Sequence, residues 1–119
     1  MSCLFNSLSK FVNVKPNNLR ENICNFLEKN PILITGDDRN ITNALCVADI
    51  IPNELSTYLS KMRNSNTWGG GIEIKAFCEI YNYQVNVHIP NNIMIPFYPI
   101  GLPLKIINIS WTGNHFIPN

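Results

Sequence analysis

The sequence predicts an α+β domain, with helices in the first two thirds of the chain and a small sheet in the last third. Apolar residues recur at helical spacing in four stretches before residue 82. Between residues 83 and 89 the period changes to two, which is typical of a half-buried strand. Prolines then divide the rest of the chain into short extended pieces. Because strands follow helices and do not alternate with them, we expect an antiparallel or mixed sheet.

Two helices are expected near the start of the chain. Residues 4–12 place apolar side chains at i, i+1, i+4, i+7 and i+8, which predicts an amphipathic helix with Cys3 at its N-terminal end. Pro16 suits the first turn of a second helix. That helix should end at Asn30, because a residue before proline disfavours the helical region. Residues 31–52 show no clean period, and they are either a loop with substrate contacts or a connection without a function of its own.

Two further helices precede the strands. Asn53 is a suitable N-cap for a third helix, whose apolar positions run from Leu55 to Met62. The glycines at 69–71 lead into a fourth helix, and we expect Ile72, Ala76, Phe77 and Ile80 to face inward. The expected strands cover residues 83–89 and 104–111, with weaker candidates at 93–97 and 115–117.

Composition excludes several classes of protein. The chain has 119 residues, 45% of them hydrophobic and 14% charged, which indicates one globular domain. Nine basic residues against eight acidic ones give a formal charge of +1, so we expect no nucleic-acid partner. No apolar run reaches the roughly 18 residues of a membrane span, and no signal segment opens the chain. We therefore expect a monomer in the cytoplasm, with reduced cysteines and no membrane contact.

Three short motifs are candidates for function, although they lie far apart. A cysteine and a histidine at opposite ends suit a cysteine hydrolase, because the nucleophile and its base meet in space and not in sequence. A helix N-terminus also favours the thiolate form of a cysteine. Taken singly, Cys3 reads as a small buried residue, His115 as a solvated histidine, and Trp68 as an indole packed at a helix start. The motifs are Cys3-Leu4-Phe5, Thr67-Trp68-Gly69-Gly70-Gly71-Ile72-Glu73-Ile74 and Gly113-Asn114-His115-Phe116.

The other cysteines and the other histidine are expected to be structural. Cys24 and Cys78 stand beside apolar residues and should be buried in the core. His88 lies on the polar face of the first strand and should be exposed and inert. Without a Cys-x-x-Cys pair, and with only two histidines in the chain, a structural zinc site is not expected.

Together the three motifs resemble the ovarian-tumour (OTU) family of cysteine proteases, most of which are deubiquitinases. Cys3-Leu4-Phe5 is similar to the nucleophile motif of that family, Tyr58 to Phe77 to its central block, and Asn114-His115-Phe116 to its closing motif. The resemblance spans the chain from Cys3 to Phe116. It implies a papain-like OTU fold in which N-terminal helices pack on a small C-terminal β-sheet.

The resemblance also implies a reaction. Cys3 would be the nucleophile, and His115 the general base and then the acid that protonates the leaving amine. The bond cleaved would be an isopeptide bond of ubiquitin or a ubiquitin-like protein, with a backbone oxyanion hole just before Cys3 and with no metal or cofactor. Trp68, Asn114 and Phe116 are expected to contact the substrate. A viral or parasitic origin would place the protein in the host cytoplasm.

The chain departs from the family pattern at two places. Family members commonly carry an Asp three residues before the nucleophile, whereas only Met1 and Ser2 precede Cys3 here. Other members use an acid or amide two residues after the histidine, whereas this chain has Ile117, so Asn119 becomes a weak candidate for the third catalytic residue. We therefore expect one OTU-like domain over residues 1–119 with a shortened N-terminus: a fragment, a weak enzyme or a degenerate one. The alternatives are a ubiquitin-binding module without activity and an OTU-like polyprotein endopeptidase.

Overall fold

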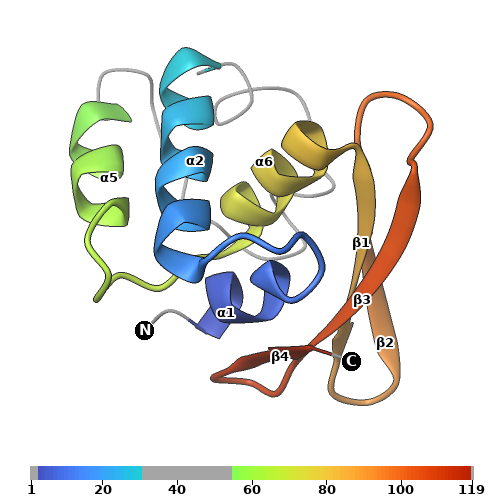
Figure 1. Cartoon of the computed structure of the whole chain (residues 1–119). Helices are drawn as coiled ribbons and strands as arrows, with labels where there is room; N and C mark the ends of the chain where they lie inside the picture. Colours follow the sequence, from blue (N-terminus) through green and yellow to red (C-terminus); the bar gives the residue numbers. More distant parts are fainter. Residues whose placement is uncertain (1–2, 31–54, 119) are drawn as a thin grey trace.

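The computed structural model describes residues 3–30 and 55–118 (Figure 1). Its helices are α1 (Cys3–Ser9), α2 (Pro16–Lys29), α5 (Leu55–Met62) and α6 (Gly71–Tyr81). Its strands are β1 (Tyr83–Ile89), β2 (Ile93–Phe97), β3 (Lys105–Trp111) and β4 (Phe116–Pro118). Helices precede strands, so the predicted α+β class is confirmed. The interpretation of residues 31–52 and the N-cap at Asn53 concern residues outside the described ranges.

The four strands form one mixed sheet in the order β2-β1-β3-β4. β1 pairs antiparallel with β2 and parallel with β3, and β4 runs antiparallel to β3. The parallel pair arises because the chain turns back along β2 and then returns on the other side of β1. The turn between β1 and β2 uses Asn91 and Asn92 in the left-handed region, at φ of 72° and 61°, where asparagine is tolerated better than most residues.

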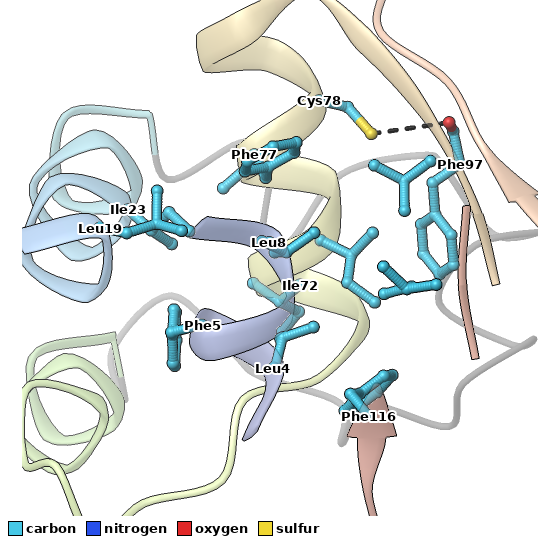
Figure 2. Packing of buried hydrophobic residues seen from close by; sticks show 14 of the residues in the cluster. Leu4, Phe5, Leu8, Leu19, Ile23, Ile72, Phe77, Cys78, Phe97 and Phe116 are labelled. Carbon is cyan, nitrogen blue, oxygen red and sulfur yellow. Dashed lines mark hydrogen bonds between the residues drawn. The ribbon is translucent and has the colours of Figure 1, made fainter. Parts of the chain in front are cut away.

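The core lies between the helices and one face of the sheet (Figure 2). Phe5 and Leu8 of α1, Ile23 of α2 and Phe77 of α6 are fully buried and meet there. α6 contacts α2 on one side and the sheet on the other, so every residue from 71 to 78 is buried. Because both sides of the helix are covered, residues 71–78 of α6 present no polar face to solvent. The apolar face that the sequence predicts is therefore only part of the surface that α6 buries.

The first helix is shorter than the sequence predicts. α1 ends at Ser9, and the next residues form tighter turns in which the amides of Lys10 and Phe11 bond to the carbonyls of Ser7 and Leu8. Asn13 then takes a left-handed φ of 54°, which an α-helix cannot include. The apolar spacing continues through this turn because Phe11 and Val12 still pack against the core. Spacing alone therefore overestimates the helix by three residues.

Two cysteines are structural, as predicted. Cys24 and Cys78 are buried free thiols. Burial raises the pKa of Cys24 to about 11 and that of Cys78 to about 12, so both are protonated at neutral pH. The Cys78 thiol also donates a hydrogen bond to the carbonyl of Phe97, at 3.5 Å (Figure 2). None of the described helices combines the length and hydrophobicity that crossing a bilayer requires.

Candidate active site

The two ends of the described chain meet where α1 contacts β4 (Figure 1). Cys3 is the first residue of α1, and its side chain is half-buried. The backbone N–H of Phe116 donates a hydrogen bond to Cys3 Sγ at 3.5 Å, across 113 positions of sequence. His115 directly precedes Phe116. The fold therefore brings the backbone of the predicted histidine next to the predicted nucleophile.

A tight turn presents His115 at the start of β4. The carbonyl of His115 accepts hydrogen bonds from the N–H of Thr112 at 2.9 Å and from its hydroxyl at 3.4 Å. Gly113 has a φ of 113°, which side-chain-bearing residues rarely adopt. The Thr112 hydroxyl also donates to Asn114 Oδ1 at 3.1 Å. These bonds fix the main chain at His115 while its side chain stays exposed.

Trp68 lies at this site and is not a buried indole. Its ring centroid is 5.7 Å from that of His115, and the two planes are tilted by 33°. The Trp68 side chain is 43% exposed. It also lines a cleft of about 260 Å³ between α5 and the loop that precedes α6. The reading of Trp68 as a packed residue at a helix start is therefore wrong, because its ring faces the imidazole and the solvent.

The loop that carries Trp68 packs directly on α1. A Cβ atom at Gly69 would lie 2.7 Å from Leu4 Cδ2, closer than such atoms approach one another in proteins, and 3.0 Å from Phe5 Cε2, which is a tight contact. Gly69 thus allows a close approach between the loop and α1, and a side chain there would displace Leu4 or Phe5. Because Leu4 and Phe5 follow Cys3 directly, this contact connects Trp68 with the helix that carries the predicted nucleophile.

Replacing Gly69 with alanine is expected to destabilise the fold by about 1–3 kcal/mol, because the new methyl group overpacks the contact with α1. Urea unfolding followed by circular dichroism measures the change. Gly101 offers a matched control, since a Cβ there would meet no atom within 4 Å. If both alanine variants unfold at the same urea concentration as the wild type, the close contact at Gly69 does not constrain the loop.

The buried carboxylate of Glu73 forms a hydrogen bond with the same loop. Glu73 is 1% exposed. It accepts a hydrogen bond from the N–H of Gly70 at 2.7 Å and another from the hydroxyl of Tyr58. Burial raises the pKa of Glu73 to about 6, although these bonds and the Arg20 guanidinium act in the opposite direction. Burial, followed by the charge of Glu73, raises the pKa of Tyr58.

Arg20 of α2 is another buried charged residue, and it packs against Phe5 of α1. Its guanidinium lies 4.2 Å from the ring centroid of Phe5, a cation–π distance, and its Nη1 donates to the carbonyl of Met62 at 2.8 Å. Burial lowers the pKa of Arg20. Sequence reasoning missed both Arg20 and Glu73. The signals were present: Arg20 shares a helical face with Cys24 and Leu27, and Glu73 stands at the third position of α6, where a carboxylate caps a helix.

The remaining predicted site residues differ in how they relate to Cys3. Asn114 is exposed beside His115, and its side chain accepts the Thr112 hydroxyl bond. Phe116 turns its backbone toward Cys3, but its ring is only 7% exposed and belongs to the core, which favours packing over substrate contact. Ile117 is exposed and has no polar atom with which to orient an imidazole. Asn119 and the loop before Cys3 lie outside the described residues.

His88 corrects one expectation. It is half-buried and not fully exposed, because Asn108 of the neighbouring strand lies beside it with Oδ1 2.9 Å from His88 Nε2. It stands on the face of β1 opposite the buried Val85 and Val87. Within the described ranges, no three His, Cys, Asp or Glu side chains are grouped to hold a metal ion.

Three solved structures with the same fold are those of OTU proteins. The OTU domain of OTUD1 superposes with a TM-score of 0.70 and 16% identity, covering 98% of this chain and 77% of that one. The viral OTU domain protease from Dera Ghazi Khan virus gives 0.66 and 18%, covering 98% and 72%. An OTU deubiquitinase from Wolbachia pipientis wMel, solved bound to ubiquitin, gives 0.64 and 20%, covering 98% and 88%. At these identities the likeness shows the fold, and it confirms the predicted OTU architecture.

The sequence itself carries the family signature over most of its length. No curated protein sequence matches the chain significantly. The sequence model of the OTU-like cysteine proteases, however, matches residues 2–113, a range that includes Cys3 and the Trp68 motif. The resemblance that the motifs indicated is thus confirmed: the chain belongs to the OTU-like cysteine protease family.

Proposed function

We propose that this protein hydrolyses isopeptide bonds at the C-terminus of ubiquitin or a ubiquitin-like protein, with Cys3 as nucleophile and His115 as general base. The hydrogen bond from the Phe116 N–H to Cys3 Sγ carries this proposal, because it places the thiol beside the residue that follows His115. Membership of a cysteine protease family supports the thiol chemistry. A structural neighbour solved with ubiquitin bound supports the choice of substrate.

The proposed reaction proceeds through a thioester. His115 takes the thiol proton of Cys3, and the sulfur attacks the carbonyl carbon of the C-terminal glycine of the modifier. The resulting imidazolium donates its proton to the leaving lysine amine as the C–N bond breaks. Water, deprotonated by His115, then attacks the thioester, which releases the carboxylate and restores the Cys3 thiol. Asn114, exposed next to His115, is proposed to contact the extended tail of the modifier.

Ubiquitin bearing a C-terminal electrophile is expected to form a covalent adduct with the wild-type protein and none with Cys3→Ala. The reason is that only a nucleophile next to the bound C-terminus can capture the electrophile. Intact mass spectrometry measures the adduct. Cys24→Ala is a matched control that removes a buried thiol and should still react. Circular dichroism establishes that each variant is folded.

Two outcomes would contradict the proposal. An adduct that persists in Cys3→Ala would remove Cys3 from the role of nucleophile. The absence of any adduct in folded wild-type protein, with ubiquitin and with ubiquitin-like probes, would contradict the proposed hydrolysis. If such a protein still binds ubiquitin in a titration, the degenerate binding module becomes the better description.

A further inference from the structure

The imidazole of His115 has an aromatic neighbour where a hydrogen-bonding partner would be expected. Within residues 3–30 and 55–118, its ring pairs with the Trp68 indole, and no described side chain forms a hydrogen bond with it. A general base must be held in one orientation to take a proton from a thiol. The bonds of Thr112 to the His115 carbonyl fix the backbone and leave the side-chain torsions free.

The indole can provide that orientation. The centroid distance of 5.7 Å and the 33° tilt lie in the range of attractive aromatic pairs. An indole also attracts a cation near its face more strongly than other aromatic side chains do. His115 becomes an imidazolium when it takes the Cys3 proton, so a ring at this distance stabilises the charged form. Orientation of the imidazole and stabilisation of the imidazolium are the two tasks that a carboxylate performs in a catalytic triad.

Trp68 is itself fixed relative to Cys3. Gly69 packs against Leu4 and Phe5 of α1, the two residues that follow Cys3. Gly70 donates its N–H to the buried carboxylate of Glu73. The backbone on the C-terminal side of the indole is thus held by α1 and by α6. An indole on a loop held in this way can hold a neighbouring ring, whereas an indole on a freely moving loop could not.

We propose that Trp68 is a positioning residue for His115: its indole orients the imidazole toward Cys3 and stabilises the imidazolium that forms. The inference rests on the proposed function only in assigning His115 the role of base. It gives Trp68 a role in the chemical step and not in substrate binding. Since Ile117 cannot orient an imidazole, the aromatic contact supplies orientation from a different part of the chain.

Trp68→Leu is expected to lower kcat about 10-fold on ubiquitin with a C-terminal fluorogenic amide, and to leave KM within about twofold. Trp68→Phe keeps an aromatic face and should retain kcat within about threefold. Leu102→Ala is the control, because this side chain is 90% exposed in the connection between β2 and β3, at the far end of the sheet from β4 (Figure 1). It should change neither constant. Thermal melts establish that all variants are folded at the assay temperature.

Three results would overturn the inference. Unchanged kcat in Trp68→Leu would show that the ring contact has no role in the reaction. A rise in KM with kcat unchanged would place Trp68 on the substrate surface. A fall in kcat as large in Trp68→Phe as in Trp68→Leu would show that an aromatic face is not what matters.

A second measurement separates this inference from the proposed function. The alkylation of Cys3 by iodoacetamide at pH 7, quantified on the Cys3 peptide by mass spectrometry, reports whether His115 activates the thiol without any ubiquitin. We expect His115→Ala and Trp68→Leu to slow alkylation by similar factors, and Trp68→Phe to react like the wild type. This result would support the inference even if no ubiquitin substrate is cleaved. If His115→Ala slows alkylation and Trp68→Leu does not, or if neither does, the inference fails.

Discussion

Replacing His115 with alanine is expected to slow cleavage of a ubiquitin conjugate by about 10²–10⁴-fold, the range in which a general acid–base contributes. The reason is the position of its backbone: the amide of the next residue, Phe116, donates a hydrogen bond to Cys3 Sγ, so the chain presents His115 beside the thiol. The loss should appear in kcat. Steady-state kinetics on a ubiquitin conjugate with a fluorogenic leaving group measures it.

The chain offers a matched control, because it contains only two histidines. His88 stands on the face of β1 turned away from the core and is hydrogen-bonded to Asn108. His88→Ala should therefore leave kcat and KM within about twofold. Equal losses in both variants would contradict a catalytic role of His115, since they would indicate a general effect of losing a histidine. Equal retention of activity would assign the base to another group.

Local pattern was sufficient to predict most of the fold. The alternation at Tyr83–Ile89 and the proline-bounded segment at Ile93–Phe97 predicted β1 and β2 with their observed bounds. Both signals act within a few residues, where periodicity reflects which face is buried. The end of α1 was misplaced, because Phe11 and Val12 are packed against the core by a turn and not by a helix. Apolar spacing reports burial, and it does not report the backbone geometry that achieves it.

For the candidate site, the sequence pattern identified the three motifs but not how they are arranged in space. The approach of the backbone at His115 to Cys3 depends on β4 pairing with β3 and contacting α1, and periodicity carries no information on such long-range pairings. The expectation that the two ends of the chain lie close together came from the resemblance to the OTU family. The contact of Trp68 with His115 was missed, because a tryptophan before a glycine run suggests packing. Arg20 and Glu73 were missed for another reason: charged residues are rarely buried, so pattern reasoning assigns them to the surface.

Replacing Glu73 with alanine is expected to destabilise the protein by about 2–6 kcal/mol, because two half-buried donors lose their buried acceptor at a cost of about 1–3 kcal/mol each. The donors are the N–H of Gly70 and the hydroxyl of Tyr58. Urea unfolding at pH 7 measures the loss. Glu21 provides a matched control, because it forms an ion pair with Arg63 at the surface, and Glu21→Ala should cost about 1 kcal/mol or less. Similar losses in the two variants would contradict the structural role of the buried carboxylate.

Glu73 should also make stability depend on pH in a direction that is unusual for an acid. Burial raises its pKa from 4.5 to about 6 in the folded protein, so the folded state holds the proton more tightly than the unfolded state does. The stability that comes from this tighter proton binding is therefore complete below pH 4.5 and is lost as the pH rises through 6. A difference of 6 − 4.5 = 1.5 pKa units corresponds to about 2 kcal/mol.

Glu73→Gln removes the titrating group at nearly constant shape, so the free energy of unfolding of the wild type, measured relative to this variant, should fall by about 2 kcal/mol between pH 4 and pH 7. Urea unfolding of both proteins across that range isolates the contribution of Glu73 titration to the free energy of unfolding, because the other titrating groups are common to both. Parallel stability curves would show that Glu73 ionises as easily in the folded chain as in the unfolded one. The bonds to Gly70 and Tyr58 and the charge of Arg20 would then offset its burial completely, and the carboxylate that accepts the Gly70 bond would be charged at neutral pH.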